Sequence, residues 1–449
     1  MTIPPTTIPP TTIPPTTTGP PLSDPVPLDD AIAAGPLDLP APLRAGYDAV
    51  LLAGFGGPEG PDEVMPFLRN VTRGRGIPEE RLIEVSHHYL ALGGVSPINA
   101  QNRDLRDALS VELVNRGRAV PVLWGNRNWA PYLADVIRDA HRDGLIRLLG
   151  LATSAYSSYS SCRQYREDFG LALSSTELVG ELRIDKVAPY HHRAGFLAPF
   201  VDGTVAALRR ASDAGLEIAD LEIVFTTHSI PRVMADTSGS ADLGDHGSGG
   251  AYVAQHLSVA RAVIDGVTAR GGAAPSWQLA YQSRSGPPSV PWLEPDINDV
   301  INDLAAAGRG GVIVVPIGFV SDHVEVIWDL DNEAAETAAG RDLFFARVGT
   351  PGTDPRFVSA LADLVEERLD QRPDPSSPDP SSPDPMPGPT PDPVTGIRRR
   401  PDFCAAGCCV NSRVTRPTTA AVDSAADWSG VAIDPQRLAA SGIRGTVQG

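Results

Sequence analysis

The chain of 449 residues lacks the features that mark several large classes of protein. No apolar run approaches the roughly 18–20 residues of a membrane-spanning helix, and the N-terminus lacks the charged and apolar regions of a secretory signal. A formal net charge of −18 argues against a nucleic-acid binder, which normally presents a basic face. Four cysteines are too few for a disulfide scaffold in a chain of this length. These absences predict a cytoplasmic protein without a transmembrane segment or a nucleic-acid partner.

The 44 prolines are concentrated in two segments of the chain. Residues 1–45 begin with three repeats of Thr-Ile-Pro-Pro-Thr, and proline at this density prevents both helices and sheet ladders. We therefore predict a disordered Pro/Thr-rich tail, with a ligand for a proline-binding module as the alternative. Residues 372–401 repeat Pro-Asp-Pro-Ser-Ser, which is typical of a stiff acidic linker. Residues 402–449 follow as a cysteine-bearing segment and a tail.

Between these segments, apolar runs of strand type alternate with amphipathic stretches of helical length. The runs suited to strands are 47–55, 119–125, 145–152, 182–189, 221–227, 277–281, 311–319 and 343–348. The helical stretches are 98–116, 130–143, 195–212, 250–270, 295–308 and 354–370. Strands and helices in alternation indicate right-handed βαβ units and parallel sheets.

Eight strands are compatible with one barrel or with two four-stranded sheets. The long connections around 56–118 and 153–181 favour the second arrangement. We therefore predict an α/β fold of two Rossmann-like, doubly wound domains, each a four-stranded parallel sheet flanked by helices. The N-terminal domain would span residues 46–175 and the C-terminal domain residues 176–353, and a terminal helix at 354–371 would pack back on the core. Ligands of such sheets bind beyond the carboxyl ends of the strands.

Two of the predicted strands end in residues of chemical interest. The first strand runs into Gly-Phe-Gly-Gly-Pro at 54–58, which lacks a complete G-x-G-x-x-G and is a weak nucleotide motif. A close approach of the backbone to a flat ligand, with Phe55 offering its face, explains the turn as well. The strand at 221–227 is followed by His228, and Pro231 closes the segment. A histidine there is either a hydrogen-bonded structural residue or part of a site.

A line of carboxylates follows the strand at 311–319. Glu325, Asp329 and Glu333 are spaced by four residues, so they share one face of a predicted helix. A solvated acidic stripe is the simplest explanation, but apolar neighbours such as Trp328 favour burial of its first member. With His228, the line supplies nitrogen and oxygen ligands and a base, a set that suits Fe²⁺ among other divalent ions.

The long connections carry further candidates for ligand contacts. Ser96 lies in the turn Gly-Gly-Val-Ser-Pro at 93–97, and Tyr165 ends a stretch rich in serine and tyrosine. Uncharged hydroxyls and aromatic rings suit a planar ligand, and Arg75 is placed to meet its anionic edges. An ordinary surface loop is the alternative for each of them.

Three of the four cysteines fall within six residues, at Cys404, Cys408 and Cys409, while Cys162 lies far away in the sequence. Four thiolates match the ligand count of a [2Fe–2S] cluster or a Cys₄ zinc site. The spacing lacks the paired C-x₂-C knuckles of zinc ribbons. Unconnected thiols are the remaining alternative.

Taken together, these motifs resemble the ferrochelatase family, and specifically its cluster-bearing bacterial form. The resemblance covers about residues 47–370, the whole predicted core, and neither tail. It rests on Phe-Gly-Gly-Pro at 55–58, Gly-Gly-Val-Ser-Pro at 93–97, Thr-His-Ser-Ile-Pro at 227–231, Tyr-Gln-Ser-Arg at 281–284, Pro-Trp-Leu-Glu-Pro at 291–295 and Val-Pro-Ile-Gly-Phe-Val-Ser-Asp-His-Val-Glu-Val at 315–326.

The resemblance implies an enzyme, a lyase of haem biosynthesis that inserts Fe²⁺ into a porphyrin held between the two domains and releases two protons. Coproporphyrin III is the substrate implied, with protoporphyrin IX, another metal, or a non-catalytic porphyrin carrier or redox sensor as alternatives. It implies that His228 and Glu325 are catalytic and face each other across the macrocycle. It also implies that Asp329 and Glu333 lead the metal inward.

The same resemblance implies that Phe55, Arg75, Ser96 and Tyr165 contact the porphyrin. Cys162, Cys404, Cys408 and Cys409 match one internal and three C-terminal ligands of a [2Fe–2S] cluster. The chain departs from the pattern in two places. Phe55 stands where some relatives have tyrosine, which excludes an axial oxygen ligand from that position. The linker at 372–401 is an insertion, but a segment of that length can span tens of ångströms, so the thiols can still reach Cys162.

Overall fold

The computed structural model describes residues 46–74, 76–239, 246–271, 275–286, 289–370 and 408–409. The predicted tail at 1–45 and the linker at 372–401 lie outside these residues, as do Arg75 and Cys404.

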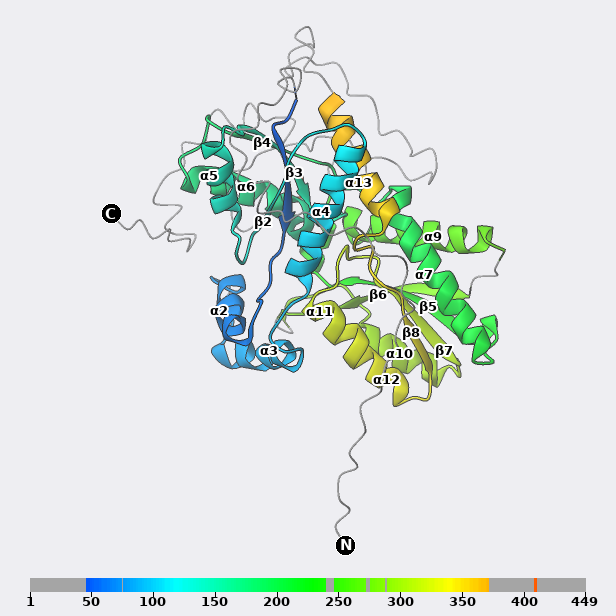
Figure 1. Cartoon of the computed structure of the whole chain (residues 1–449). Helices are drawn as coiled ribbons and strands as arrows, with labels where there is room; N and C mark the ends of the chain where they lie inside the picture. The colour runs from blue at the N-terminus through cyan, green and yellow to red at the C-terminus, as the bar shows by residue number, and fades with distance from the viewer. Residues whose placement is uncertain are drawn as a thin grey trace. The chain divides into compact units, whose positions relative to one another are not determined.

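Two four-stranded parallel sheets form the centre of the described structure (Figure 1). The first sheet has the order β2-β1-β3-β4, and the second has the order β6-β5-β7-β8. Their strands are β1 (Ala49–Gly54), β2 (Val122–Asn126), β3 (Arg147–Ala152), β4 (Arg183–Lys186), β5 (Leu221–His228), β6 (Ser276–Gln282), β7 (Gly311–Val315) and β8 (Phe344–Arg347). All residues of β1 and β7 are buried, as expected for strands covered on both faces. The predicted α/β fold with two parallel sheets is confirmed.

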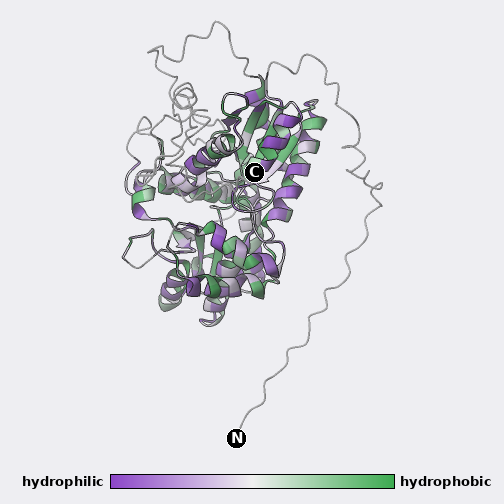
Figure 2. Cartoon of the chain, turned by 90° about the vertical axis from the view of Figure 1, so that its left-hand side faces the viewer, coloured by the Kyte–Doolittle hydropathy of each residue, from purple (hydrophilic) through white to green (hydrophobic). Residues whose placement is uncertain are grey.

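Helices connect the strands and cover the sheets. Purple and green residues alternate along these helices in Figure 2, as amphipathic helices over a buried sheet require. The longer helices are α2 (Pro61–Val71), α3 (Glu79–Ala91), α4 (Ile98–Asn115), α5 (Leu133–Arg142), α6 (Gln164–Ser175), α7 (Ala194–Asp213), α9 (Gly250–Ala269), α10 (Ile297–Ala306) and α13 (Pro355–Asp370). Shorter elements are α8 (Arg232–Asp236), α11 (Val324–Val326), α12 (Ala335–Ala339) and the π-helices η2 (Tyr159–Arg163) and η5 (Ile327–Ala334).

The first sheet extends past residue 175, where the predicted boundary between the domains falls. Strand β4 pairs with β3, and Gly150 is in register with Lys186. The connection at 153–181 contains helix α6, which is the crossover between these two strands. The division between the sheets therefore lies after β4 and before β5.

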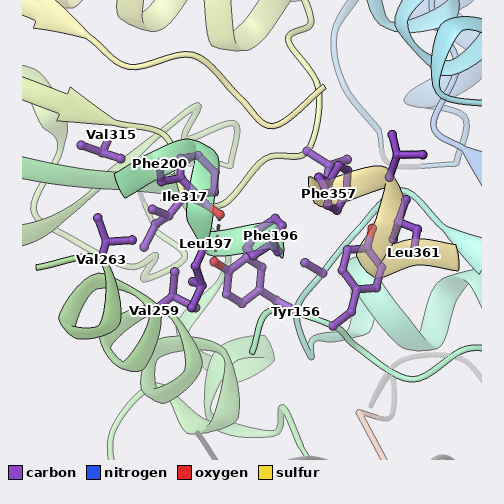
Figure 3. Close-up of a cluster of buried hydrophobic side chains, with 14 of the residues drawn as sticks. Tyr156, Phe196, Leu197, Phe200, Val259, Val263, Val315, Ile317, Phe357 and Leu361 are labelled. Carbon is purple, nitrogen blue, oxygen red and sulfur yellow. Dashed lines mark hydrogen bonds between the residues drawn. The ribbon is translucent and has the colours of Figure 1, made fainter. Parts of the chain in front are cut away.

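One continuous core of buried side chains joins the two sheets. Helix α13 contributes Phe357 and Leu361 to it, so the terminal helix packs on the core. Figure 3 shows the centre of this cluster, where the hydroxyl group of Tyr156 donates a hydrogen bond to the carbonyl oxygen of Ile317 over 2.8 Å. Because Tyr156 follows β3 and Ile317 follows β7, this bond links the carboxyl-terminal sides of the two sheets.

Candidate active site

Three neighbouring strands of the second sheet bring polar side chains to one edge. β5 ends at His228, β6 ends at Gln282, and the segment after β7 leads to Glu325. β5 lies between β6 and β7, and all three run parallel. The carboxyl ends of parallel strands share an edge, so residues far apart in the sequence meet there.

The imidazole of His228 lies directly beside the carboxylate of Glu325. Its Nε2 atom is 3.6 Å from Oε2 of Glu325, and about one third of the histidine side chain and half of the glutamate side chain are exposed. Nδ1 of His228 contacts the carbonyl oxygen of Ser229. A proton on Nδ1 satisfies that carbonyl and leaves the lone pair on Nε2, which points toward Glu325.

This distance corrects one expectation from the sequence. His228 and Glu325 were expected to face each other across the macrocycle. A flat ring needs van der Waals separation on both faces, roughly 3.5–4 Å each, and 3.6 Å in total leaves no room for it. In this arrangement the two side chains do not lie on opposite faces of a ring, so we expect both on one face of a porphyrin bound at this edge.

The carboxylate line continues into a π-helix rather than the α-helix that was predicted. Element η5 begins two residues after Glu325 and contains both Asp329 and Glu333. π-Helical turns are rare in proteins overall, and those that occur are often found at functional sites. The three carboxylates still interact, since charges on Glu325 and Glu333 both act on Asp329.

The carboxyl group of Asp329 has a strongly raised pKa. Burial, followed by repulsion from Glu325 and Glu333, raises its pKa to about 7. Hydrogen bonds from Ser283 and Gln282 to Oδ2 act in the opposite direction. Ser283 holds its position with φ near +60°, a conformation that non-glycine residues rarely adopt. The strained loop after β6 thus delivers a hydroxyl group to Asp329.

Glu333 lies at the exposed end of the line and is held by an aromatic pair. The indole Nε1 of Trp328 donates to Oε1 of Glu333 over 2.8 Å. The ring of Trp328 stacks on His88 of α3, with centroids 4.3 Å apart and planes 9° from parallel. Burial lowers the pKa of His88. Helix α3 is therefore joined to the π-helix beside the carboxylates.

Helices α2 and α3 connect the first sheet to this edge through a small apolar cluster. Phe67 and Tyr89 pack there with Val324, the residue before Glu325. The ring of Phe55 meets Phe67 edge-on, with centroids 6.5 Å apart, and keeps 37% of its own surface exposed. A flat apolar ligand lying on Phe55 would thus be linked by direct packing to the carboxylate line.

The loop at 54–58 and the loop at 93–97 pack against each other. Ser96 N donates to the carbonyl oxygen of Pro58 over 2.8 Å, and a Cβ atom at Gly57 would lie 2.7 Å from Cβ of Ser96. Glycine is required there by this contact between loops. Ser96 itself is buried.

Tyr165 does not join the other predicted porphyrin contacts. It is 3% exposed within the core of the first sheet, and the guanidinium of Arg127 lies over its ring at 3.9 Å from the centroid. Burial raises the pKa of its hydroxyl group. Such burial argues against direct contact with a ligand. Arg75 lies outside the described residues.

Three of the four cysteines meet in the structure. Cys162 of η2 packs with Cys408 and Cys409 in a buried cluster. The sulfur atoms of Cys408 and Cys409 are 3.5 Å apart, and the backbone N–H of Gly239 points at Sγ of Cys409 over 3.1 Å. Cys404 lies outside the described residues. Over the described ranges, no group of three or more histidine, cysteine or acidic side chains has the geometry of a metal site.

Sequence reasoning did not single out several residues that build this edge. Ser283 and Gln282 belong to the Tyr-Gln-Ser-Arg segment, which had no role assigned to it. Tyr89 and His88 lie in a long connection, where the adjacent histidines at 87–88 were the one sequence feature that could have drawn attention to a site. Among the helices described, none is long and apolar enough to cross a membrane.

The fold and the site define a class of α/β protein in which two parallel sheets support a histidine–carboxylate pair at their strand ends. A model of the family described as ferrochelatase matches residues 47–369. The chain belongs to the ferrochelatase family.

Curated relatives are similar over most of their length. The coproporphyrin III ferrochelatase of Leifsonia xyli subsp. xyli is 52% identical over 375 residues, which are 82% of this chain and 92% of that protein. The protein of the same name from Streptomyces coelicolor is 51% identical over 382 residues, covering 84% of this chain and 97% of the relative. The one from Mycolicibacterium smegmatis is 44% identical over 365 residues, covering 81% and 99%.

Proposed function

We propose that this chain inserts Fe²⁺ into coproporphyrin III and releases two protons, as a step of haem biosynthesis. The observation that carries the proposal is the pairing of His228 Nε2 with Glu325 Oε2 at 3.6 Å, at the carboxyl edge of a sheet in a ferrochelatase-family chain. Two relatives that are about half identical to it carry the name coproporphyrin III ferrochelatase.

In the proposed mechanism, His228 removes the two protons of the central pyrrole nitrogens one after the other and passes each of them to solvent. Its Nδ1 is occupied by the carbonyl oxygen of Ser229, so the lone pair of Nε2 is directed toward the reacting centre. Glu325 lies next to that lone pair. Its carboxylate either stabilises the imidazolium that forms or replaces a water molecule on the incoming Fe²⁺. Both groups act from one face of the ring.

A planar porphyrin hides its nitrogen lone pairs within the ring plane. We infer that the binding energy of the macrocycle is used to distort it, so that one face exposes a lone pair to the metal. Phe55 is 37% exposed and supplies an apolar face for this contact. The positive charge of Arg75 is proposed to meet a polar edge of the same ligand. Ser96, by contrast, is as buried as Tyr165. It is proposed to support the loop of Phe55 through its bond to Pro58.

Asp329 and Glu333 form the proposed path for Fe²⁺. Glu333 and Glu325 are exposed, and Asp329, which follows the one and precedes the other along the line, is half-buried. A carboxyl group with a pKa of about 7 exchanges protons and metal readily near neutral pH. The proposed order of transfer along the line is Glu333, Asp329 and then Glu325, because Glu325 lies beside the imidazole of His228.

The buried thiols fit a [2Fe–2S] cluster as the resident cofactor. Cys162, Cys408 and Cys409 already pack together, and Gly239 directs an N–H group at one sulfur, as donors commonly do around such sites. Cys404 is the proposed fourth ligand. A bound cluster would supply one-electron chemistry. Reduced thiols of this kind are maintained in the cytoplasm, where we place the protein.

An anaerobic assay with Fe²⁺ and either coproporphyrin III or protoporphyrin IX tests the proposed reaction through the spectrum of the metalloporphyrin. We expect faster turnover with coproporphyrin III. His228→Ala should abolish insertion and preserve porphyrin binding, and normal turnover by that variant would rule out the mechanism. If the parent chain binds porphyrin without turnover, it is a carrier instead.

The cluster is tested separately. Cys408→Ser should remove the visible absorbance of the purified protein together with its acid-labile sulfide, with Ser161→Ala as the control beside Cys162. An unchanged spectrum in Cys408→Ser would exclude the assignment of that ligand.

A further inference from the structure

Lys186 is the only lysine among the 37 basic residues of the chain, and it is buried. It ends strand β4 and exposes 6% of its surface. Lysine is almost never this buried without an anionic or polar partner, because removing an ammonium group from water is energetically costly. The position therefore requires a partner of that kind.

The atoms around the ammonium group identify the partner. Nζ of Lys186 donates to Sγ of Cys162 over 3.7 Å and to the carbonyl oxygen of Val187 over 3.0 Å. Within the described part of the chain, no carboxylate forms an ion pair with Lys186. The cysteine sulfur is thus the group whose ionisation would balance the buried charge.

Cys162 is not an isolated thiol. It packs with Cys408 and Cys409, and the sulfur of Cys409 accepts a bond from the backbone of Gly239. Two sulfur atoms of this group are therefore approached by N–H donors from different parts of the fold, and one of the donors belongs to a cation. Hydrogen bonds and positive charge at thiolate sulfurs are the means by which proteins tune bound iron–sulfur clusters.

We propose that Lys186 is the counter-charge of the cysteine group and sets the reduction potential of the cluster held there. This inference rests on the cluster proposed above. Thiolate-bound clusters carry net negative charge, and one-electron reduction adds one further negative charge. A buried ammonium group beside one ligand stabilises the reduced form more than the oxidised form. Lys186 thereby raises the potential and holds the sulfur of Cys162 in place.

The experiment measures the reduction potential of the cluster in the full-length protein by anaerobic spectroelectrochemical titration. Lys186→Met removes the charge and the donor, Lys186→Gln keeps a donor without charge, and Lys186→Arg keeps both. Arg209→Met is the matched control, since it removes one positive charge from an exposed position of α7. Iron and sulfide content and the far-ultraviolet circular dichroism are recorded for each protein.

We expect Lys186→Met and Lys186→Gln to lower the ratio of reduced to oxidised cluster at a fixed potential about tenfold, which is 59 mV for one electron. Lys186→Arg and Arg209→Met should keep the parent value. A folded Lys186→Met protein that loses the cluster, while Lys186→Arg retains it, also supports the proposal.

The proposal is overturned if Lys186→Met holds the cluster at the parent potential. If that variant does not fold, equal potentials in Lys186→Gln and Lys186→Arg overturn it. A parent chain that contains no cluster overturns both this inference and the cluster assignment. Iron insertion assayed on the same preparation then shows whether the proposed reaction survives independently.

Discussion

The hydroxyl group of Tyr252 donates a hydrogen bond to the backbone carbonyl of His228 over 2.8 Å. The same hydroxyl group lies 2.8 Å from Oγ1 of Thr227, so Tyr252 contacts the last two residues of β5. Tyr252 belongs to α9, which covers this sheet and contributes to its core. Helix α9 thereby fixes the end of the strand that carries the proposed proton acceptor.

Tyr252→Phe should reduce the rate of iron insertion more than it reduces porphyrin affinity. Removing the hydroxyl group leaves the carbonyl oxygen of His228 without this donor, at a cost of about 1–3 kcal/mol in the free energy of unfolding. The imidazole then loses its fixed position, so kcat should fall while the dissociation constant of the porphyrin changes little. Steady-state kinetics and fluorescence titration measure the two quantities.

Tyr190→Phe is the matched control for this change. The hydroxyl group of Tyr190 donates to the carbonyl oxygen of Ala152 over 2.9 Å, in the first sheet. It should cost a similar free energy of unfolding without lowering kcat. Equal losses of kcat in both variants would mean that Tyr252 acts only through global stability.

The pH dependence of iron use should follow the protonation of Asp329. Because its pKa is raised to about 7, the carboxylate is present above that pH and is lost as the pH falls through it. The kcat/KM for Fe²⁺ should therefore decline on the acid side of about pH 7. Ser283→Ala removes a hydrogen bond that lowers the pKa of Asp329, so the acid limb should move to higher pH.

The control for Ser283→Ala is Ser258→Ala, since Ser258 is an exposed residue of α9 whose hydroxyl group donates to the carbonyl oxygen of Ala254 in the same helix. Its pH profile should match that of the parent chain. An acid limb that stays in place in Ser283→Ala would show that Asp329 does not control the capture of iron.

The sheets were predictable because their strands are buried on both faces and therefore appear as continuous apolar runs. The long helices were predictable from their amphipathic period: 98–116 was expected and α4 spans Ile98–Asn115, while 195–212 was expected and α7 spans Ala194–Asp213. Helices α2 and α3 were not predicted. Their buried residues pack mainly on each other and on Val324, a contact that no local period reveals.

The site was predictable only as a set of strand ends. Parallel topology requires His228 and the segment at Glu325 to share an edge, and they do. Their separation of 3.6 Å depends on the path of the connection after β7 and on the π-helix η5. A π-helix follows an i→i+5 bonding pattern that leaves no distinct spacing of apolar residues here. The position of the Ser283 hydroxyl group depends on a left-handed backbone conformation, which serine rarely adopts and which the sequence therefore does not predict.

Stability in acid should depend on His256. This residue is fully buried and stacked on Tyr156 at 3.6 Å between ring centroids, and burial lowers its pKa to about 3. In the unfolded chain this imidazole binds a proton below about pH 6.5, whereas in the folded chain it stays neutral. The free energy of unfolding is therefore highest above pH 6.5 and falls as the pH decreases toward 3. The contribution is about 1.4 kcal/mol per pH unit in that window.

His256→Gln should therefore flatten the dependence of the free energy of unfolding on pH between 6.5 and 4.5. Chemical denaturation at a series of pH values gives the slopes, and His87→Gln at an exposed position of α3 is the control. Parallel curves for the parent and His256→Gln would show that burial of this imidazole does not determine acid sensitivity.

Phe55 should contribute apolar contact to the porphyrin and nothing to the chemistry. Its ring is 37% exposed and is supported edge-on by Phe67. Phe55→Ala should weaken porphyrin binding about tenfold, since aromatic contacts of this kind contribute about 0.5–1.5 kcal/mol beyond the area they bury, and kcat at saturating porphyrin should be preserved. Phe55→Tyr should retain affinity because the ring remains.

Ile83→Ala, at an exposed apolar residue of α3, should leave binding unchanged. Fluorescence titration of the three variants separates a contact at Phe55 from a general loss of exposed apolar surface, and unchanged affinity in Phe55→Ala would remove this residue from the proposed porphyrin site.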